Sequence, residues 1–200
     1  MTSYAHSQKS TNIEMNSPHD MKNAFLVGDT MYLRPLDETD LNAAYLSWFN
    51  DAETCRFNEH HRFPMHVEDL RGYFDTVVRS KGNLILAIAD TSTDAHIGNV
   101  SLQNIDWVNR SAEFAIIVGD KEHWGKGVAT QAGRLVIEHG FSALNLHRIH
   151  CGTSADNVPM QKLAAALGFT QEGVQRDAMW KDGAYRDIIV YGILSHGKPA

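Results

Sequence analysis

The chain has 200 residues, of which 43% are hydrophobic, 21% charged and 9% aromatic. These proportions are typical of one globular domain and exclude a fibrous or disordered chain. Lys and Arg number 18 and Asp and Glu 24, which gives a formal net charge of −6. Because the basic residues form no stripe that could follow a phosphate backbone, we expect no nucleic-acid partner.

The cysteine content and the length of the apolar runs indicate in which cellular compartment the chain is expected. Cys55 and Cys151 have no metal-like spacing, and no charged segment followed by an apolar one opens the chain. We therefore expect reduced thiols and a cytoplasmic location. Charged residues interrupt every apolar run before the roughly 18 residues that a membrane span needs. We therefore expect no membrane partner.

The pattern along the chain predicts a tail followed by one domain. Residues 1–28 are rich in Ser, Asn and His and lack an apolar period, so we predict an N-terminal tail or arm before a domain over residues 29–196. Alternating and helical apolar spacings then predict the elements in order. They are a strand at 31–33, helices at 37–48 and 67–79, strands at 84–89, 97–103 and 111–118, a helix at 128–145, a strand at 147–153, a helix at 158–167 and two strands around 181–183. This order predicts a mixed α/β fold with helices around one central sheet.

The most informative segment is EHWGKGVATQA, residues 122–132, which lies between a predicted strand and a predicted helix. Gly125 and Gly127 leave room for a ligand near the main chain, and the unpaired amides of the first helical turn point at one place. With the positive end of the helix dipole, they predict a diphosphate site. The same glycines would also suit a tight turn without a ligand, and the loop alone leaves both interpretations open. No Walker A or dinucleotide-binding pattern is present.

Four segments together carry a family resemblance: SAEFAIIV (111–118), HWGKGVATQAGRLVIEHGF (123–141), LHRIHCGT (146–153) and NVPMQKLAAALGF (157–169). Over about residues 30–194 the chain resembles the GNAT superfamily of acetyl-CoA-dependent N-acetyltransferases, in the branch that includes ribosomal-protein N-terminal acetyltransferases. The segment YLSWFNDAE (45–53) is also similar to enzymes that acetylate nucleotide-linked amino sugars. The resemblance implies a mostly antiparallel sheet in which two parallel strands splay apart in a V, with helices on both faces.

The resemblance also implies where acetyl-CoA would lie. Its pyrophosphate would rest on the glycine loop (residues 125–130), and its pantetheine arm would pair with the strand that ends at Val118. The residues implied to bind it are Ile116, Ile117, Val118, Gly125, Lys126, Gly127, Val128, Ala129, Thr130 and Asn157. Asn157 precedes Pro159 and equally suits a helix cap, so both roles stay open.

The catalytic residue that we predict is Glu113, which interrupts an apolar strand beside the implied thioester. A partly desolvated carboxylate there could deprotonate an attacking amine, although a structural carboxylate paired with Arg or His would give the same pattern. The chain departs from the family at Glu122, where a Gln or Arg is usual. It also departs at Ala164 and Met160, where relatives carry Tyr and Ser. The proton donor to the leaving thiolate is therefore unassigned.

We interpret Trp48 and Asn50 as acceptor-binding residues because they lie in the segment that resembles amino-sugar acetyltransferases. No metal is expected, since neither His60, His61 and His66 nor His147 and His150 are completed by a carboxylate or thiol at ligand spacing. Cys151, in an apolar strand, is predicted to be a core residue rather than a nucleophile.

The sequence thus predicts direct acetyl transfer from acetyl-CoA to a primary amine, either a small molecule such as a nucleotide-linked amino sugar or a protein or peptide N-terminus. The alternative is a non-catalytic acyl-CoA-binding regulatory module, which the departures at Ala164 and Met160 keep open. A homodimer, including one that exchanges residues 1–28, is a further hypothesis.

Overall fold

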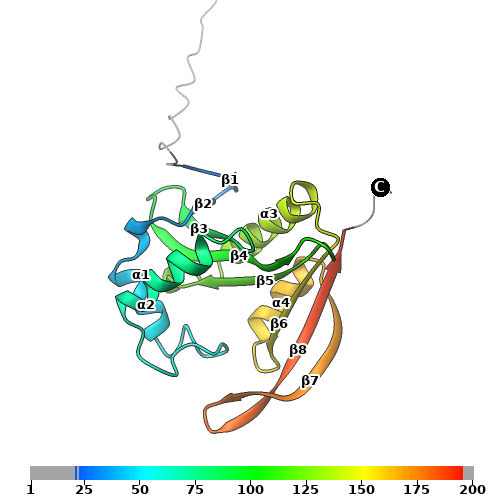
Figure 1. Cartoon of the computed structure of the whole chain (residues 1–200). Coiled ribbons are helices and arrows are strands. Elements are labelled where there is room, and N and C mark those ends of the chain that lie inside the picture. Colours follow the sequence, from blue (N-terminus) through cyan, green and yellow to red (C-terminus); the bar gives the residue numbers. More distant parts are fainter. Residues whose placement is uncertain (1–20, 22, 196–200) are drawn as a thin grey trace, which may run out of the picture.

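One eight-stranded sheet organises the computed structural model, which describes residue 21 and residues 23–195 (Figure 1). The strands are β1 (Leu26–Val27), β2 (Met31–Pro35), β3 (Leu84–Asp90), β4 (His96–Asp106), β5 (Ser111–Val118), β6 (Arg148–Ser154), β7 (Thr170–Lys181) and β8 (Ala184–Leu194). The helices are α1 (Ala43–Asn50), α2 (Val67–Tyr73), α3 (Val128–Ser142) and α4 (Val158–Ala166), with short turns η1 (Glu38–Asp40), η2 (Phe74–Val78) and η3 (Lys121–His123). Across the sheet the strands run β1-β2-β3-β4-β5-β6-β8-β7.

The two faces of the sheet are covered by different helices. On one face the buried Val136 of α3 and Ala164 of α4 pack against Leu102 of β4 and Ile149 of β6. On the other face, apolar residues of α1, α2 and η2 form a smaller cluster around Ala87 of β3. Because neighbouring residues of a strand point to opposite faces, β3 serves both clusters, with Leu86 and Ile88 in the first and Ala87 in the second. The predicted fold class is confirmed.

The sheet opens between its two parallel strands. Pairing of β5 with β6 covers Ser111 with Arg148, Ala112 with Ile149 and Glu113 with His150. The pairing of β5 with β6 ends at Glu113, whereas the pairing of β5 with β4 continues to Val118. Every other recorded strand pair is antiparallel. The V-shaped splay implied by the resemblance is therefore present, with residues 114–118 along one arm.

Several boundaries differ from the predicted ones, and three of the differences change how the elements are arranged. The helix expected over 37–48 is interrupted, because Asp37 caps η1 and the Oδ1 of Asn42 then accepts the amides of Ala44 and Tyr45 at 3.0 and 3.1 Å to begin α1. Helix α3 ends at Ser142, before the predicted 145. The sheet also begins inside the predicted arm, since β1 pairs with β2. Residues 1–20 and 22 of that arm lie outside the described residues.

None of the helices in the part of the chain that the structure describes is long and apolar enough to cross a membrane.

Candidate active site

The glycine loop connects η3 to α3 at the open end of β5. Gly125 and Gly127 have φ values of 72° and 80°, a left-handed conformation that glycine adopts without strain. A Cβ built at either position would meet no other described atom within 4 Å, so the loop is open on its outer side. The first helical bond of α3 runs from the Gln131 amide to the Gly127 carbonyl at 3.1 Å. The amides of residues 128–130 therefore precede the helical ladder and have no acceptor within α3.

This arrangement fits the diphosphate of a coenzyme A molecule. Backbone N–H groups at a helix start attract an anion, and here they belong to a helix of 15 residues. Lys126, an exposed residue of the loop, adds a positive charge beside them. Glu122, the departure noted in the sequence, is also exposed, and so its charge lies in solvent. A diphosphate there would thus be held by backbone amides and Lys126 rather than by an arginine or glutamine side chain.

The free arm of the V is partly occupied by the protein itself. The indole Nε1 of Trp124 donates to the carbonyl of Val118 at 2.7 Å, and this bond fixes the end of β5 against the glycine loop. Of the three residues implied to pair with pantetheine, Val118 therefore has its carbonyl committed. The edges of Ile116 and Ile117 lie in the segment of β5 that has no recorded pair with β6.

Asn157 acts as a helix cap in this structure. Its Oδ1 accepts the Met160 amide at 3.1 Å at the start of α4, and its Nδ2 donates to the Oγ1 of Thr153 at 2.9 Å. Both polar ends of the side chain are thus engaged within the protein. The cap is observed, and a contact with the cofactor stays a prediction.

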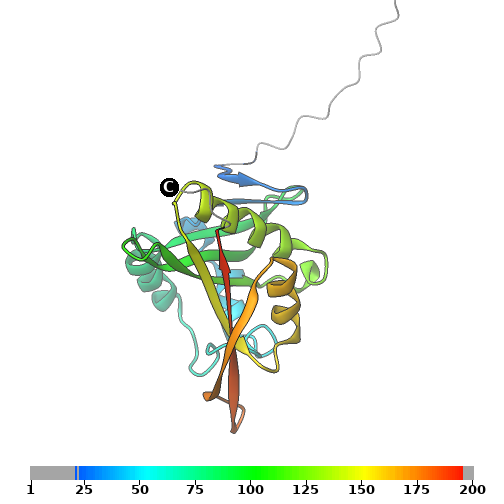
Figure 2. The same ribbon diagram turned by 90° about the vertical axis from the view of Figure 1, so that its right-hand side faces the viewer.

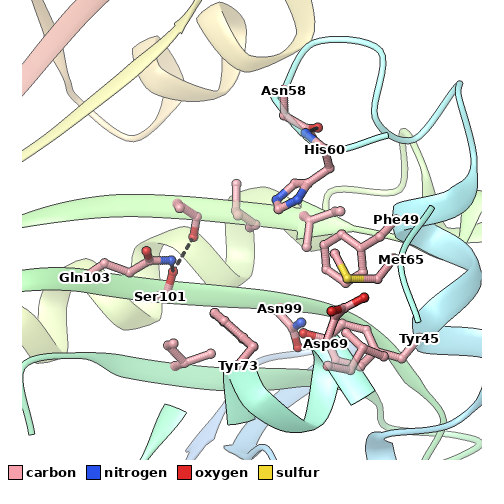
Figure 3. Close-up of a pocket in the computed structure, with 15 residues that line it drawn as sticks. Tyr45, Phe49, Asn58, His60, Met65, Asp69, Tyr73, Asn99, Ser101 and Gln103 are labelled. Carbon is pink, nitrogen blue, oxygen red and sulfur yellow. Dashed lines mark hydrogen bonds between the residues drawn. The ribbon is translucent and has the colours of Figure 1, made fainter. Parts of the chain in front are cut away.

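A cavity of about 420 Å³ lies between the sheet and the helices α1 and α2 (Figure 3). We call it the first cavity. It is lined by Tyr45, Phe49, Asn58, His60, Met65, Asp69, Leu70, Tyr73, Ile85, Asn99, Ser101, Gln103, Ala115, Ile116 and Ile117. Figure 3 shows Asn99, Asp69 and Tyr45 near one end and Ser101 and Gln103 near the other. Because Ala115 to Ile117 belong to the free arm of the V, the cavity abuts the strand on which the resemblance places the thioester.

The polar groups of the first cavity are mostly neutral. Asp69 is the one carboxylate among the described lining residues, and these residues include neither Lys nor Arg. Burial raises the pKa values of Tyr45 and Tyr73, so both phenols keep their protons at neutral pH. Gln103 donates to the Oγ of Ser101 at 2.9 Å. The cavity can therefore offer several hydrogen bonds and a single negative charge.

Asn99, one of the lining residues, is held in place by a buried chain of polar groups on the side away from the cavity. The Oδ1 of Asn99 lies 2.8 Å from the Nε2 of His96, whose Nδ1 is 3.5 Å from the Oδ1 of Asp40. Asp40 in turn accepts two hydrogen bonds from Arg34 at 2.7 Å. Burial lowers the pKa of His96, which favours its neutral form. This chain fixes the amide of Asn99 at the wall of the cavity.

Glu113 is half-buried and lies on β5 opposite Gln103 of β4. Since Ala112 and Phe114 point into the core, Glu113 faces the same side of the sheet as Ala115, which lines the first cavity. Glu113 itself is not part of the lining. Its Oε2 accepts a hydrogen bond from the Nδ2 of Asn104 at 3.1 Å. Within the described residues no Arg or His forms an ion pair with it.

The two predicted acceptor-binding residues have structural contacts instead. Trp48 is 6% exposed, and its ring centroid is 4.9 Å from that of His96. Asn50 holds the chain near α2, because its Nδ2 donates to the Met65 carbonyl at 2.9 Å and its Oδ1 accepts the Met65 amide at 2.8 Å. Neither residue lines the first cavity, whereas Phe49 between them does.

Two other predictions concern the thiols and metals. Cys151 is buried in the main core, and burial together with nearby Glu113 raises its pKa to about 12, so it is a core thiol as predicted. Among the described residues, no three His, Cys, Asp or Glu side chains come together in a group that could hold a metal ion.

A family model for the acetyltransferase (GNAT) domain matches residues 30–170. The chain belongs to the GNAT family. The probable N-acetyltransferase YjcK of Bacillus subtilis is 30% identical over 176 residues, which cover 85% of this chain and 97% of that protein. The predicted family and the N-acetyltransferase class are thus confirmed.

Solved structures of GNAT proteins have the same fold. Spermidine N-acetyltransferase from Vibrio cholerae, in complex with CoA and spermine, has a TM-score of 0.76 and 26% identity, over 82% of this chain and 95% of that one. The ribosomal protein acetyltransferase RimL, in complex with coenzyme A, also has a TM-score of 0.76 over 84% of this chain and 96% of that one. At 21% identity, the likeness to RimL shows the fold alone.

Sequence reasoning missed most of the first cavity of this GNAT protein, although two local signals were present. Asp69 and Tyr73 are four residues apart and share one side of α2. Asn99, Ser101 and Gln103 alternate along β4, a period that places polar groups on one face of a strand. Both patterns indicate polar groups that face the same way, but neither shows that the helix and the strand oppose each other.

Proposed function

We propose that this GNAT protein transfers the acetyl group of acetyl-CoA directly to the primary amine of a small molecule held in the first cavity. The observation that supports this most strongly is the position of that cavity against residues 115–117, on the free arm of the V. An amine in the cavity and a thioester along β5 would meet at one strand. Holding two reactants in this way supplies a large part of the rate enhancement of direct transfer reactions.

On the donor side, the residues present fit coenzyme A. The amides of Val128, Ala129 and Thr130 would hold the diphosphate, and the edges of Ile116 and Ile117 would pair with the pantetheine arm. When bound, acetyl-CoA supplies an acetyl group activated as a thioester. The CoA-bound structure of the Vibrio cholerae relative supports this proposal.

Glu113 is the proposed general base. An amine must lose a proton to attack, and the Glu113 carboxylate faces the side of the sheet on which the first cavity lies. The hydrogen bond from Asn104 orients the carboxylate and leaves its other oxygen available. Glu113 lies two residues from Ala115 on the same face of β5 but does not line the first cavity. We therefore propose that it accepts the proton through a water molecule.

The shape of the first cavity favours a small acceptor. A volume of about 420 Å³, walled by two helices and the sheet, matches a small-molecule site. A protein N-terminus would need a channel for the chain that follows it. The single carboxylate of Asp69 can attract one ammonium group, and the aromatic rings of Tyr45, Phe49 and Tyr73 can contact the carbon skeleton.

The experiment that tests this function is the release of CoA from acetyl-CoA across a panel of polyamines, amino sugars, their nucleotide-linked forms and N-terminal peptides. We expect turnover on a small amine, with cofactor binding followed in parallel by calorimetry. Binding of acetyl-CoA without turnover on any amine would support the regulatory module instead. Absence of binding would contradict the donor assignment.

The same assay tests the general base. Glu113→Gln should lower kcat at neutral pH by about 10²–10⁴-fold, the usual contribution of a positioned base, while the affinity for acetyl-CoA stays the same. Glu122→Gln is the matched control, because Glu122 is exposed and makes the same charge change beside the glycine loop. Unchanged transfer in Glu113→Gln would remove Glu113 from this role.

A further inference from the structure

A second cavity, of about 410 Å³, lies at the far end of the hairpin formed by β7 and β8. It is lined by Arg56, Phe57, Ser154, Ala155, Asp156, Val158, Met179, Lys181, Asp182 and Arg186. Its walls come from the segment after α1, from the end of β6 with the start of α4, and from the hairpin. Figures 1 and 2 both show the hairpin reaching down beside the segment that joins α1 to α2.

Three cationic side chains from three separate elements line this second cavity. Arg56 is exposed, lies with its guanidinium carbon 5.1 Å from the centre of the Phe57 ring, and forms no ion pair within the described residues. The Nε of Arg186 is 3.3 Å from the Oδ2 of Asp156, which leaves its two terminal nitrogens available. Lys181 donates to the carbonyls of Cys55 at 3.1 Å and His60 at 3.4 Å and keeps one further proton.

The two cavities therefore differ sharply in charge. The described lining of the first cavity contains one carboxylate and no cation, whereas that of the second contains three cations and two carboxylates, Asp156 and Asp182. Asp156 is already paired with Arg186. Since the whole chain carries a net charge of −6, three cations around one cavity are a local exception. Such a local excess attracts an anionic ligand group whatever the overall charge.

The cavities also share one wall. Arg56 and Phe57 line the second cavity, while Asn58 and His60 line the first. Two residues of chain span at most about 7 Å, so Arg56 and Asn58 lie within the length of a sugar ring and its substituents. Neighbouring linings of this kind are what a single small molecule with one end in each cavity would require.

We propose that the second cavity binds a phosphate group of the acceptor while the acceptor's amine lies in the first cavity. This inference rests on the proposed function and makes the substrate a phosphate-bearing amine rather than a polyamine. Two arginine forks and a lysine match the several oxygens of a phosphate or diphosphate. The hydroxyl of Ser154, which accepts the Asp156 amide at 3.3 Å, still has its proton to donate.

The first test measures binding without any need for catalysis. Pyrophosphate is titrated calorimetrically into the full chain saturated with CoA, so that the glycine loop is already occupied. We expect wild-type binding that weakens about tenfold or more in Arg56→Gln and in Arg186→Gln. Asp156→Asn should tighten binding several-fold, because it frees Arg186. Arg134→Gln is the matched control, since exposed Arg134 on α3 carries the same charge and does not line the second cavity.

Two results of this titration would overturn the proposal. One is the absence of pyrophosphate binding to the wild type, and the other is an equal loss in Arg134→Gln, which would indicate a general charge effect.

The second test compares glucosamine with glucosamine 1-phosphate as acceptors. We expect the phosphate to lower KM about tenfold and the advantage to disappear in Arg56→Gln. Efficient turnover of spermidine, with no preference for the phosphate and no effect of Arg56→Gln, would refute the inference while leaving the acetyltransferase function intact. Pyrophosphate binding without turnover of any amine would instead refute the proposed function and, with it, the acceptor role of the second cavity.

Discussion

The pair of Arg34 and Asp40 permits a prediction whose size follows from burial. Their side chains are 11% and 4% exposed, and the two terminal nitrogens of the guanidinium donate to the carboxylate at 2.7 Å. Asp40 also accepts the amide of Asp37 at 2.9 Å. Asp40→Asn keeps the shape but leaves a buried guanidinium without its countercharge. Breaking a buried pair from one side costs about 3–5 kcal/mol. For a domain of this size that is a decrease of about 6–20 °C in Tm.

The matched control lies two residues earlier in the same turn. Glu38 pairs with Arg79 at 3.1 Å, but these side chains are 61% and 57% exposed. Glu38→Gln should therefore change the free energy of unfolding by at most about 1 kcal/mol, and high salt should abolish the effect. Both changes remove one carboxylate charge from η1, but Asp40 is buried and accepts several hydrogen bonds, whereas Glu38 is exposed and has one ion-pair partner.

Urea denaturation at pH 7, followed by tryptophan fluorescence, measures both variants. We expect an unchanged m value and a midpoint that falls far more for Asp40→Asn than for Glu38→Gln. The double variant Arg34→Met/Asp40→Leu should recover much of the loss, because no charge is then left buried. A loss below about 1 kcal/mol for Asp40→Asn, or one equal to that of Glu38→Gln, would refute the argument.

Three further predictions concern the glycine loop, α4 and pH. Gly127→Ala should lower stability by about 1 kcal/mol and weaken CoA binding in calorimetry, because Gly127 has a φ of 80°, whereas Gly72→Ala in exposed α2 should raise stability. Asn157→Ala should lower the free energy of unfolding by about 1 kcal/mol, because the cap of α4 is lost, and Asn157→Asp should keep the cap. If both variants also lose affinity for CoA in calorimetry, Asn157 contacts the cofactor. Burial lowers the pKa of His96 below its usual 6.5, so the unfolded chain takes up this proton first as the pH falls. The free energy of unfolding should thus decrease below about pH 6.5, by at most about 1.4 kcal/mol per pH unit. Urea midpoints measured across a pH series should fall less steeply with pH in His96→Asn than in the wild type. The control His61→Asn, at an exposed position, should leave this slope unchanged.

The elements predicted best are those whose burial pattern is periodic and one-sided. Strand 111–118 has the predicted bounds, because Ala112 and Phe114, which face the main core, alternate with Glu113 on the opposite face. The start of α3 at Val128 also follows from the sequence, because the glycine loop ends at Gly127 and an apolar stripe at helical spacing begins at Val128. The interruption before α1 was not predicted. It depends on Asn42 accepting two amides, a choice between capping and helix interior that apolar spacing alone does not decide.

The site could be predicted only where it is local. The glycine loop is a contiguous segment, so its conformation and open amides follow from residues that are adjacent in sequence. The first cavity combines segments as distant as Tyr45 and Ile117, and no single segment predicts it. Trp48 shows the difficulty. It lies beside cavity-lining Phe49, but it packs so closely against Gly119 that a Cβ there would be 1.9 Å from its ring. Proximity in sequence therefore does not decide which of two adjacent aromatic residues lines the first cavity.

The donor and acceptor sides of this GNAT protein place different demands on the sequence. In the proposed function the glycine loop would contact its ligand through backbone amides, so this contact would constrain the side chains of the loop less than an acceptor site built from side chains does. The proposed acceptor side would depend on side chains, among them Asp69 and Arg56, that lie on irregular or short elements. Since a polyamine and a phosphate-bearing amine require opposite charges there, the acceptor of a relative does not transfer with the fold. The substrate of this chain must therefore be inferred from its own cavities.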